Sequence, residues 1–242
     1  MRAGHNGRQL ISSDFGVMPP PTERHLQVHR TARYFVAGEP GDKTTELWIA
    51  LHGYGQLAEP FARVLAPLSN ESRVIVAPEA LNRFYLDEPA KRHGPDSPVG
   101  AGWMTREDRL NEIDDYVHFL DAVVDDVRRG IGRRDLRIVM LGYSQGVATA
   151  CRWAALGKTR ADRVILWGGA IAADLPTDRG DQLWYGASVV MVAGRKDTVV
   201  PVSFMEKERR TLTARGLRVD LVEYDGGHAL HSETLRQLAA TV

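Results

Sequence analysis

Ser144 is the residue whose surroundings most clearly indicate chemistry. It lies in the pentapeptide Gly142-Tyr143-Ser144-Gln145-Gly146, after the apolar run 136–141 and before the small, apolar segment 147–156. This G-x-S-x-G pattern between a predicted strand and a predicted helix is that of a nucleophile elbow, a tight turn that exposes a serine hydroxyl. The two glycines lack a Cβ and allow strand and helix to approach closely. We therefore predict that Ser144 is a nucleophile, which needs a nearby base and donors for an oxyanion.

A base and an orienting acid are expected later in the chain. Residues 189–193 are predicted to form a buried strand, and the loop that follows contains Asp197. Residues 218–224 alternate like a strand and lead into His228. The order Ser, Asp, His on loops that follow strands is one that nucleophile-elbow enzymes use. We predict that Asp197 orients the imidazole of His228, which takes the proton of Ser144 and returns it to the leaving group.

Other acidic residues are weaker candidates for the orienting role. Asp225 precedes His228 by three residues on the same turn, so it is poorly placed to reach the imidazole as an independent partner. Asp174, Asp178 and Asp181 fall in a polar loop that no predicted strand leads into.

Donors for an oxyanion are expected near the N-terminus. The apolar segment 45–51 is predicted to be a strand, and it ends in His52-Gly53-Tyr54-Gly55. In nucleophile-elbow enzymes an HG-type turn at this place supplies one backbone amide, and the residue after the nucleophile supplies the other. The predicted donors are therefore the N–H groups of Tyr54 and Gln145. His52 is predicted to be structural, because it ends a central strand and is placed to bond neighbouring loops.

Four short segments together resemble a known family. HGYG, GYSQG, GRKDTVVP and GGHAL are similar to the corresponding blocks of the phospholipase/carboxylesterase family of serine hydrolases, which includes acyl-protein thioesterases and small carboxylesterases. The resemblance extends from about Arg33 to the C-terminus. It implies an α/β-hydrolase fold, no cofactor, and hydrolysis of carboxylic esters or thioesters. Val147 stands where many relatives have glycine, and Gln56 replaces the acidic residue that often follows the HG turn in thioesterases; both departures bear on the substrate.

The elements that must position these residues alternate between strands and helices. Strands are predicted near residues 25–37, 45–51, 73–77, 136–141, 163–167, 189–193 and 218–224. Helices are predicted near residues 58–68, 106–129, 144–156, 201–215 and 230–240. This rhythm predicts an α/β fold with a mostly parallel, doubly wound sheet flanked by helices, an antiparallel pair at its N-terminal side, and the functional groups at the carboxyl ends of its strands.

Size and composition fit one enzyme domain. With 242 residues, 43% of them hydrophobic, the chain can bury the core of a single domain over residues 23–242, after a partly ordered arm over residues 1–22. Its 31 basic and 31 acidic residues cancel, so net charge favours neither nucleic acid nor an anionic membrane as a partner. The sequence shows no signal peptide and no apolar stretch long enough for a membrane span, so we expect a cytoplasmic protein. No metal and no cofactor are expected.

The single cysteine, Cys151, excludes an internal disulfide and is expected to be a buried, inert thiol.

Substrate preference should come from loops, and residues 78–103 form the longest segment without clear periodicity. We predict that this segment covers a short pocket with Trp103 and Met104 as substrate-binding residues, although such residues can equally anchor a loop. Trp184 and Tyr185 are alternative pocket residues, or contacts of a possible homodimer.

The sequence thus predicts a serine carboxylesterase that acts on a small, short-acyl ester through an acyl-enzyme on Ser144. An acyl thioesterase or a lysophospholipase of the same fold would use the same chemistry. A catalytically silent binding module is the alternative from another class, and the complete set of Ser, Asp, His and HG elements argues against it.

Overall fold

The computed structural model describes residues 20–87, 92–133, 135–175 and 186–241. The chain divides into two units, residues 1–31 and residues 32–242. Residues 20–31 are exposed and have no regular secondary structure. The strand expected over residues 25–37 is present only as β1 (Tyr34–Ala37). The apolar side chains Leu26 and Val28, which suggested an earlier start, are 87% and 76% exposed and have no core to face.

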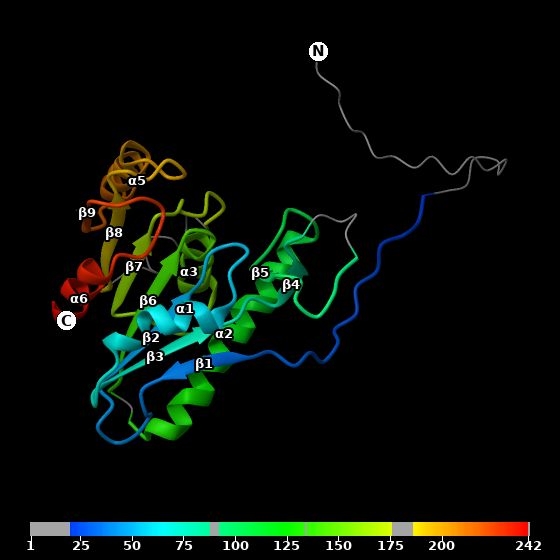
Figure 1. The fold of residues 1–242 in the computed structure, drawn as a ribbon, viewed down its shortest axis with the longest axis horizontal. Helices are drawn as coiled ribbons and strands as arrows, with labels where there is room; N and C mark the ends of the chain where they lie inside the picture. The colour runs from blue at the N-terminus through cyan, green and yellow to red at the C-terminus, as the bar shows by residue number, and fades with distance from the viewer. Residues whose placement is uncertain (1–19, 88–91, 134, 176–185, 242) are drawn as a thin grey trace, which may run out of the picture. The chain divides into compact units, whose positions relative to one another are not determined.

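A seven-stranded sheet forms the centre of the second unit in the described residues (Figure 1). Its order is β1, β3 (Arg73–Pro78), β2 (Glu46–Leu51), β6 (Arg137–Tyr143), β7 (Arg163–Trp167), β8 (Ser188–Gly194) and β9 (Val219–Tyr224). β1 runs antiparallel to β3, and all other neighbours are parallel. The central strands are continuous apolar runs because both faces of the sheet are covered. The expected α/β fold, with a mostly parallel sheet, is confirmed.

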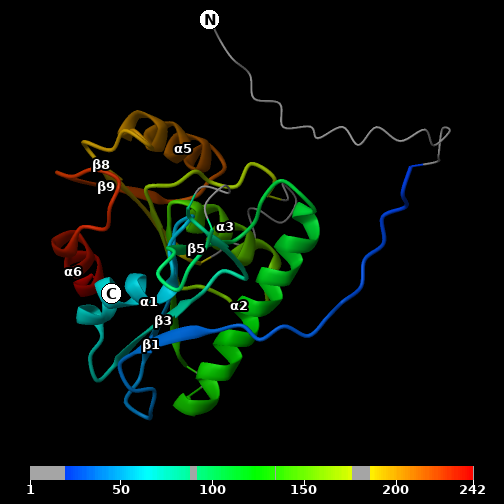
Figure 2. The ribbon, with the colours of Figure 1, turned by 45° about the vertical axis from the view of Figure 1, so that its right-hand side comes forward.

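Helices cover the two faces of this sheet in two layers (Figure 2). On one face lie α1 (Ala58–Leu65), the short 3₁₀ helix η1 (Ala66–Leu68) and α6 (Ser232–Ala240). On the other face lie α2 (Arg109–Ile131), α3 (Gln145–Leu156) and α5 (Val202–Ala214). Alternate strand residues supply the two cores: Trp48 packs with α1, whereas Ile49 packs with the α2 and α3 side. The carboxyl ends of the parallel strands therefore meet at one edge, between the layers.

A small β-hairpin replaces the structureless loop that the sequence predicted over residues 78–103. β4 (Asn82–Tyr85) pairs antiparallel with β5 (Val99–Gly102). The hairpin also bonds the turn after β2, since Gly55 N–H donates to the Ala101 carbonyl at 2.8 Å and Ala101 N–H donates to Gln56 O at 3.2 Å. Glycine is required at residue 100, because a Cβ there would lie 2.5 Å from the carbonyl oxygen of Gly55. The hairpin thus fixes the backbone that follows His52.

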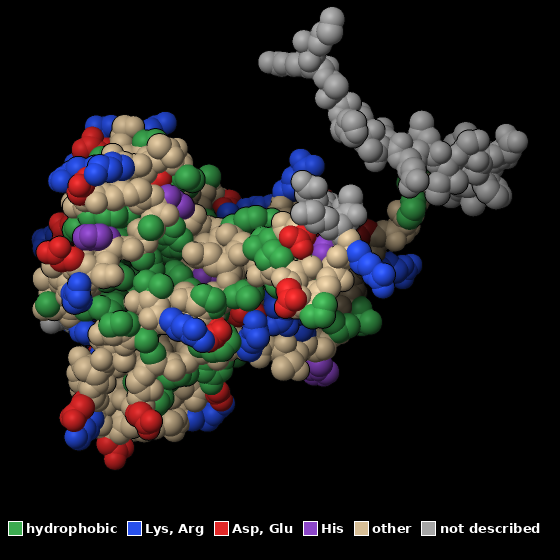
Figure 3. Space-filling view, in the orientation of Figure 1, with side chains coloured by type: hydrophobic (Ala, Val, Ile, Leu, Met, Phe, Trp, Pro, Cys, Tyr) green, Lys and Arg blue, Asp and Glu red, His purple; other side chains and the backbone are tan. Residues whose placement is uncertain are grey.

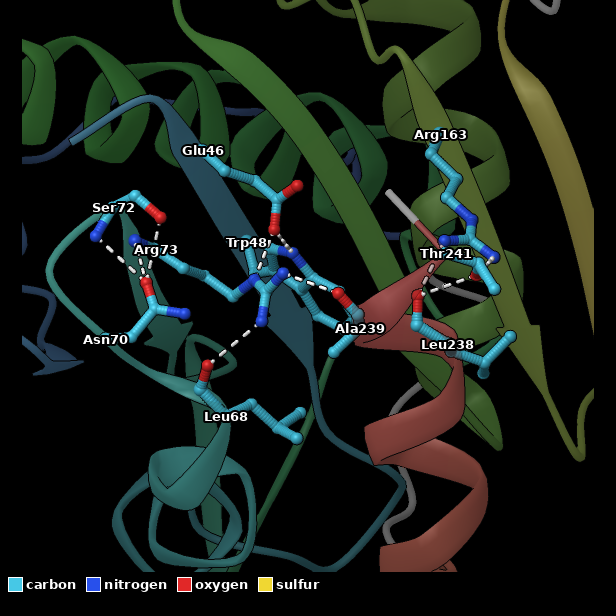
Figure 4. Close-up of polar contacts among 10 residues, drawn as sticks. All are labelled: Glu46, Trp48, Leu68, Asn70, Ser72, Arg73, Arg163, Leu238, Ala239 and Thr241. Atoms are coloured by element: carbon cyan, nitrogen blue, oxygen red, sulfur yellow. Dashed lines mark hydrogen bonds and ion pairs between the residues drawn. The ribbon is translucent and has the colours of Figure 1, made fainter.

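Two arginines hold the C-terminal end of α6 (Figure 4). Arg73, at the start of β3, donates from Nη2 to the carbonyl of Ala239 at 2.6 Å, and its Nε contacts Glu46. Arg163, at the start of β7, donates from Nη1 to the carbonyl of Leu238 at 2.7 Å. The last carbonyls of a helix have no intrahelical donor and carry partial negative charge, so guanidinium groups stabilise them. These contacts, hereafter the arginine clasp, fasten the helix that follows His228 to the sheet.

Within the described residues, none of the helices combines the length and the apolar character that a membrane span requires.

Candidate active site

Ser144 lies between β6 and α3 in a strained backbone conformation. Its φ of 54° and ψ of −117° place it among the few non-glycine residues that have a positive φ. Ser144 N–H donates to the carbonyl of Trp167 at the end of β7 at 2.9 Å, and Val147 N–H closes the turn on the Ser144 carbonyl at 3.0 Å. Glycine is needed at position 146, because a Cβ there would lie 2.2 Å from the carbonyl oxygen of Leu51. The turn expected from the sequence pattern is present and exposes the Ser144 hydroxyl beyond the strand end.

A chain of hydrogen bonds links Ser144, His228 and Asp197. The Ser144 Oγ lies 3.0 Å from His228 Nε2, and His228 Nδ1 lies 2.7 Å from Asp197 Oδ2. A carboxylate only accepts hydrogen bonds, so Nδ1 is the ring nitrogen that donates to Asp197, which leaves Nε2 to accept from the serine. Such a chain can remove the serine proton during attack on a carbonyl carbon.

Asp197 is held as a buried carboxylate and is not a solvated turn residue. Its side chain is 1% exposed. The backbone N–H groups of Val199 and Val200 each donate to Oδ1 at 2.8 Å, which leaves Oδ2 for the imidazole. The loop after β8 therefore fixes the direction in which the carboxylate faces His228.

The rejected acidic candidates that the structure describes are engaged elsewhere. Asp225 is exposed, and the hydrogen bond from Lys196 and the charge of that lysine lower its pKa. Asp174 pairs with Arg152 and Arg109, and despite partial burial these hydrogen bonds lower its pKa to about 2. Asp178 and Asp181 lie outside the described residues.

The loop that carries His228 is held through its carbonyl groups. Tyr143, the variable residue of the pentapeptide, donates its hydroxyl to the His228 carbonyl at 2.8 Å. The Tyr224 hydroxyl lies 2.6 Å from the carbonyl oxygen of Ala229, and Trp167 Nε1 donates to the same oxygen at 3.1 Å. Burial, with the nearby charges of Tyr224 and Asp197, raises the pKa of Tyr143 to about 12, so its hydroxyl remains a donor at any working pH.

Two backbone amides near the ends of β2 and β6 are free of protein acceptors among the described residues. In the part of the chain that the structure describes, the N–H groups of Tyr54 and Gln145 donate to no protein acceptor. The turn that carries Tyr54 is held by Gln56, whose Oε1 accepts from Gly53 N–H at 2.8 Å. An acidic residue at position 56 could accept the same bond, so glutamine keeps the turn and removes a negative charge.

The side chain of Gln145 fixes the other amide. Its Oε1 accepts from Trp103 N–H at 3.0 Å, and its Nε2 donates to the Met104 carbonyl at 3.0 Å. The first residue of α3 is thereby tied to the segment after β5. Side-chain amides thus hold both the turn that carries Tyr54 and the first residue of α3.

His52 is a structural residue, as the sequence indicated. It is fully buried, and Nε2 accepts from Ala80 N–H at 3.1 Å, so Nδ1 donates to the Gly53 carbonyl at 2.8 Å. Burial lowers its pKa, which keeps the ring neutral. Its contacts join the end of β2 to the end of β3.

A groove of about 550 Å³ opens beside His228. Its lining residues are Gly55, Gln56, Leu57, Pro60, Phe61, Val64, Val99, Tyr143, His228, Ala229 and Leu230. Figure 3 shows hydrophobic side chains gathered over α1 and beside it, together with adjacent basic and acidic side chains over the same helix.

Trp103 and Met104, the predicted substrate-binding residues, do not line this groove. Trp103 is 1% exposed, and its Nε1 donates to the His52 carbonyl at 2.8 Å, so it anchors the hairpin beneath the site. The Met104 sulfur accepts from Arg152 at 3.3 Å. Trp184 and Tyr185 lie outside the described residues. Residue type identified an apolar side chain near the site but not the side from which it packs.

Cys151 is fully buried on α3, and burial raises the pKa of its thiol to about 12. This agrees with the expectation of an inert thiol.

Several residues that shape the site were not found from the sequence. Gln56 and Gln145 were recognised only as motif positions, although a polar side chain beside each predicted backbone donor is a usable signal. For the groove wall on α1, the sequence contains a clearer signal. Val64 is an apolar residue on the exposed side of the helix, spaced i+3 from Phe61 and i+4 from Pro60, the spacing of one helix face.

Comparisons with known proteins identify a family for the sequence and similar solved structures for the fold. A family model described as Phospholipase/Carboxylesterase matches residues 32–242. The solved structures that the fold is similar to include esterase PE8, with a TM-score of 0.61 and 22% identity over 87% of this chain and 96% of that one. Acyl-protein thioesterase 2 of Zea mays has a TM-score of 0.65 and 16% identity, over 87% and 97% of the two chains. A phospholipase/carboxylesterase from Dyadobacter fermentans has a TM-score of 0.60 and 18% identity, over 89% and 98%. No curated protein matches the chain.

Proposed function

The chain belongs to the phospholipase/carboxylesterase family of α/β-hydrolases, and from that premise we propose that it is a serine carboxylesterase acting on small, uncharged esters through an acyl-enzyme on Ser144. The observation that carries the proposal is the hydrogen-bond chain from Ser144 Oγ through His228 to Asp197, with 3.0 Å and 2.7 Å between its atoms.

In the first half of the reaction, His228 Nε2 takes the proton as Ser144 Oγ bonds to the ester carbonyl carbon. The carbonyl oxygen becomes negative and accepts from the N–H groups of Tyr54 and Gln145, each worth roughly 3–4 kcal/mol in the barrier. The C–O bond to the alcohol then breaks, and the imidazolium gives its proton to the departing oxygen. Asp197 stabilises the imidazolium between these steps.

In the second half, a water molecule gives a proton to His228 Nε2 and attacks the acyl carbon. The Ser144 ester bond breaks, the serine recovers its proton, and the carboxylic acid leaves. Every proton is handled by residues of this chain, so the proposal needs no cofactor.

Labelling with a fluorophosphonate probe tests the proposal directly, because the probe bonds only to an activated serine. The wild-type protein should label stoichiometrically, and Ser144→Ala should neither label nor hydrolyse p-nitrophenyl acetate, while its circular dichroism and melting temperature stay unchanged. We expect a fall in kcat of about 10⁶-fold. Equal labelling of Ser144→Ala would exclude Ser144 as the nucleophile.

An inert wild-type protein that still bound an ester analogue would indicate a binding module instead. A panel with matched thioesters and a lysophospholipid distinguishes the related activities, because these share the acyl-enzyme and differ only in the group that leaves.

A further inference from the structure

We propose that the groove between α1 and the loop after β9 is a subsite for the alcohol part of the ester, and that it takes apolar, uncharged alcohols. The inference rests on the proposed function and adds which end of the substrate lies in the groove and what chemistry that end has. We call this groove the alcohol groove. Its walls are Pro60, Phe61 and Val64 on one side and Ala229 and Leu230 on the other.

The position of His228 decides which part of the ester enters. Once Ser144 Oγ has bonded to the carbonyl carbon, the alcohol oxygen must lie within hydrogen-bond distance of Nε2 to receive the proton. The oxyanion is bound by the amides of Tyr54 and Gln145 in the proposed mechanism. The alcohol therefore leaves past the face of the imidazole, and the groove that the imidazole itself lines begins there.

The described lining of the alcohol groove has no charged carboxylate, lysine or arginine to match a charged alcohol. Among the lining residues that the structure describes there is no lysine, arginine, aspartate or glutamate. Two of the polar side chains hold backbone groups: Gln56 Oε1 accepts from Gly53, and the Tyr143 hydroxyl donates to the His228 carbonyl. A cation or a phosphate in the groove would lose water without gaining an oppositely charged carboxylate, lysine or arginine among these residues, which is costly. A linear or branched hydrocarbon loses nothing there and gains buried area.

The size of the groove sets the scale of the effect. At about 550 Å³ it lies within the range of sites that bury small ligands. Each methylene of the alcohol that is buried in the transition state should raise kcat/KM about fourfold. Acetate esters should therefore react faster as the alcohol grows from methyl to hexyl, until the groove is filled.

Val64 offers the means to test this assignment. It is 48% exposed at the outer wall of the groove, so a larger or charged side chain is accommodated without disturbing the core. With Val64→Trp, the ratio of kcat/KM for hexyl acetate to that for methyl acetate should fall at least tenfold, because the indole fills the groove. The same variant should leave the ratio of ethyl octanoate to ethyl acetate unchanged, since the acyl chain lies elsewhere. Leu110→Trp, at an apolar residue that is 71% exposed on α2, is the matched control and should change neither ratio.

A pair of isosteric esters tests the charge preference. Wild type should prefer 3,3-dimethylbutyl acetate to acetylcholine by at least tenfold, because the two alcohols differ only in a quaternary carbon and a quaternary ammonium. Val64→Glu should reduce this preference severalfold, by placing a carboxylate beside the groove. This second variant keeps the test open if Val64→Trp does not fold.

The outcomes are distinct. An alcohol-length ratio that Val64→Trp leaves unchanged would overturn the proposal, and so would a change confined to the acyl series, which would place the acyl chain in the groove. Wild type without turnover of either series, and without Ser144 labelling, would overturn the proposed function itself, and the subsite with it.

Discussion

The two sides of Ser144 are held by opposite kinds of group. On one side the proposed reagents are the side chains of His228 and Asp197, and backbone or hydroxyl groups fix their loops. On the other side the proposed reagents are backbone amides, and the side chains of Gln56 and Gln145 fix them. A reagent that is a side chain is named by its residue type, whereas a backbone donor has no chemical identity in the sequence. The residues to change on the oxyanion side are therefore the glutamines.

The largest loss of kcat is expected on the side of His228 and Asp197, when the charge of Asp197 is removed. Asp197→Asn should lower kcat for p-nitrophenyl acetate about 10⁴-fold, because an amide neither holds the required tautomer nor stabilises the imidazolium. Asp225→Asn is the control, since Asp225 is exposed and pairs with Lys196. It should remain within twofold of wild type. A reversed result, with Asp225→Asn inactive, would transfer the orienting role to Asp225.

A smaller loss is expected on the oxyanion side. Gln56→Leu removes the acceptor of Gly53 N–H and should lower kcat about tenfold to a hundredfold with little change in KM, because loosening a donor costs less than the 10²–10³-fold of deleting one. A boronic acid, which imitates the tetrahedral intermediate, should bind more weakly by a similar factor. Gln237→Leu on the exposed face of α6 serves as control. A loss as large as that of Asp197→Asn would show that Gln56 does more than hold the turn.

Removing the Tyr143 hydroxyl, which holds the His228 loop, should lower kcat less than removing His228 or Asp197 themselves. Tyr143→Phe deletes one hydrogen bond to the His228 carbonyl and should lower kcat about threefold to tenfold, in keeping with about 1 kcal/mol for such a bond. Because burial raises the pKa of Tyr143 to about 12, the hydroxyl stays protonated, and the ratio of wild type to variant should be the same at pH 6 and pH 9. A ratio that changes between these values would indicate that Tyr143 takes part in proton transfer.

The smallest effect is expected at Cys151. The thiol is fully buried with a pKa raised to about 12 by that burial, so native protein should resist iodoacetamide and keep its activity. Unfolding in urea should allow one equivalent to react. Rapid inhibition of the native protein would show that α3 opens during turnover.

The sequence predicted the parallel core and the side-chain reagents for the same reason. Asp197 and His228 each follow a strand, and parallel strands bring their carboxyl ends to one edge whatever lies between them in the chain. The hairpin was not predicted, because Val99–Gly102 contains two glycines and the partner strand has only four residues, which gives little alternation to detect. Trp103 was assigned to a pocket because residue type does not indicate the side from which a ring packs.

Through the arginine clasp, the position of His228, the proposed catalytic base, depends on the local stability of α6. His228 lies between β9 and a helix whose far end is held by guanidinium groups and not by strand pairing. Segments of this kind can open in a sub-global step, with a free energy below that of complete unfolding. Mild denaturant that releases α6 would separate the imidazole from Ser144 while the central strands remain paired. As denaturant is raised, turnover would then be lost before the sheet unfolds. The rate of hydrolysis would therefore report on the opening and closing of α6.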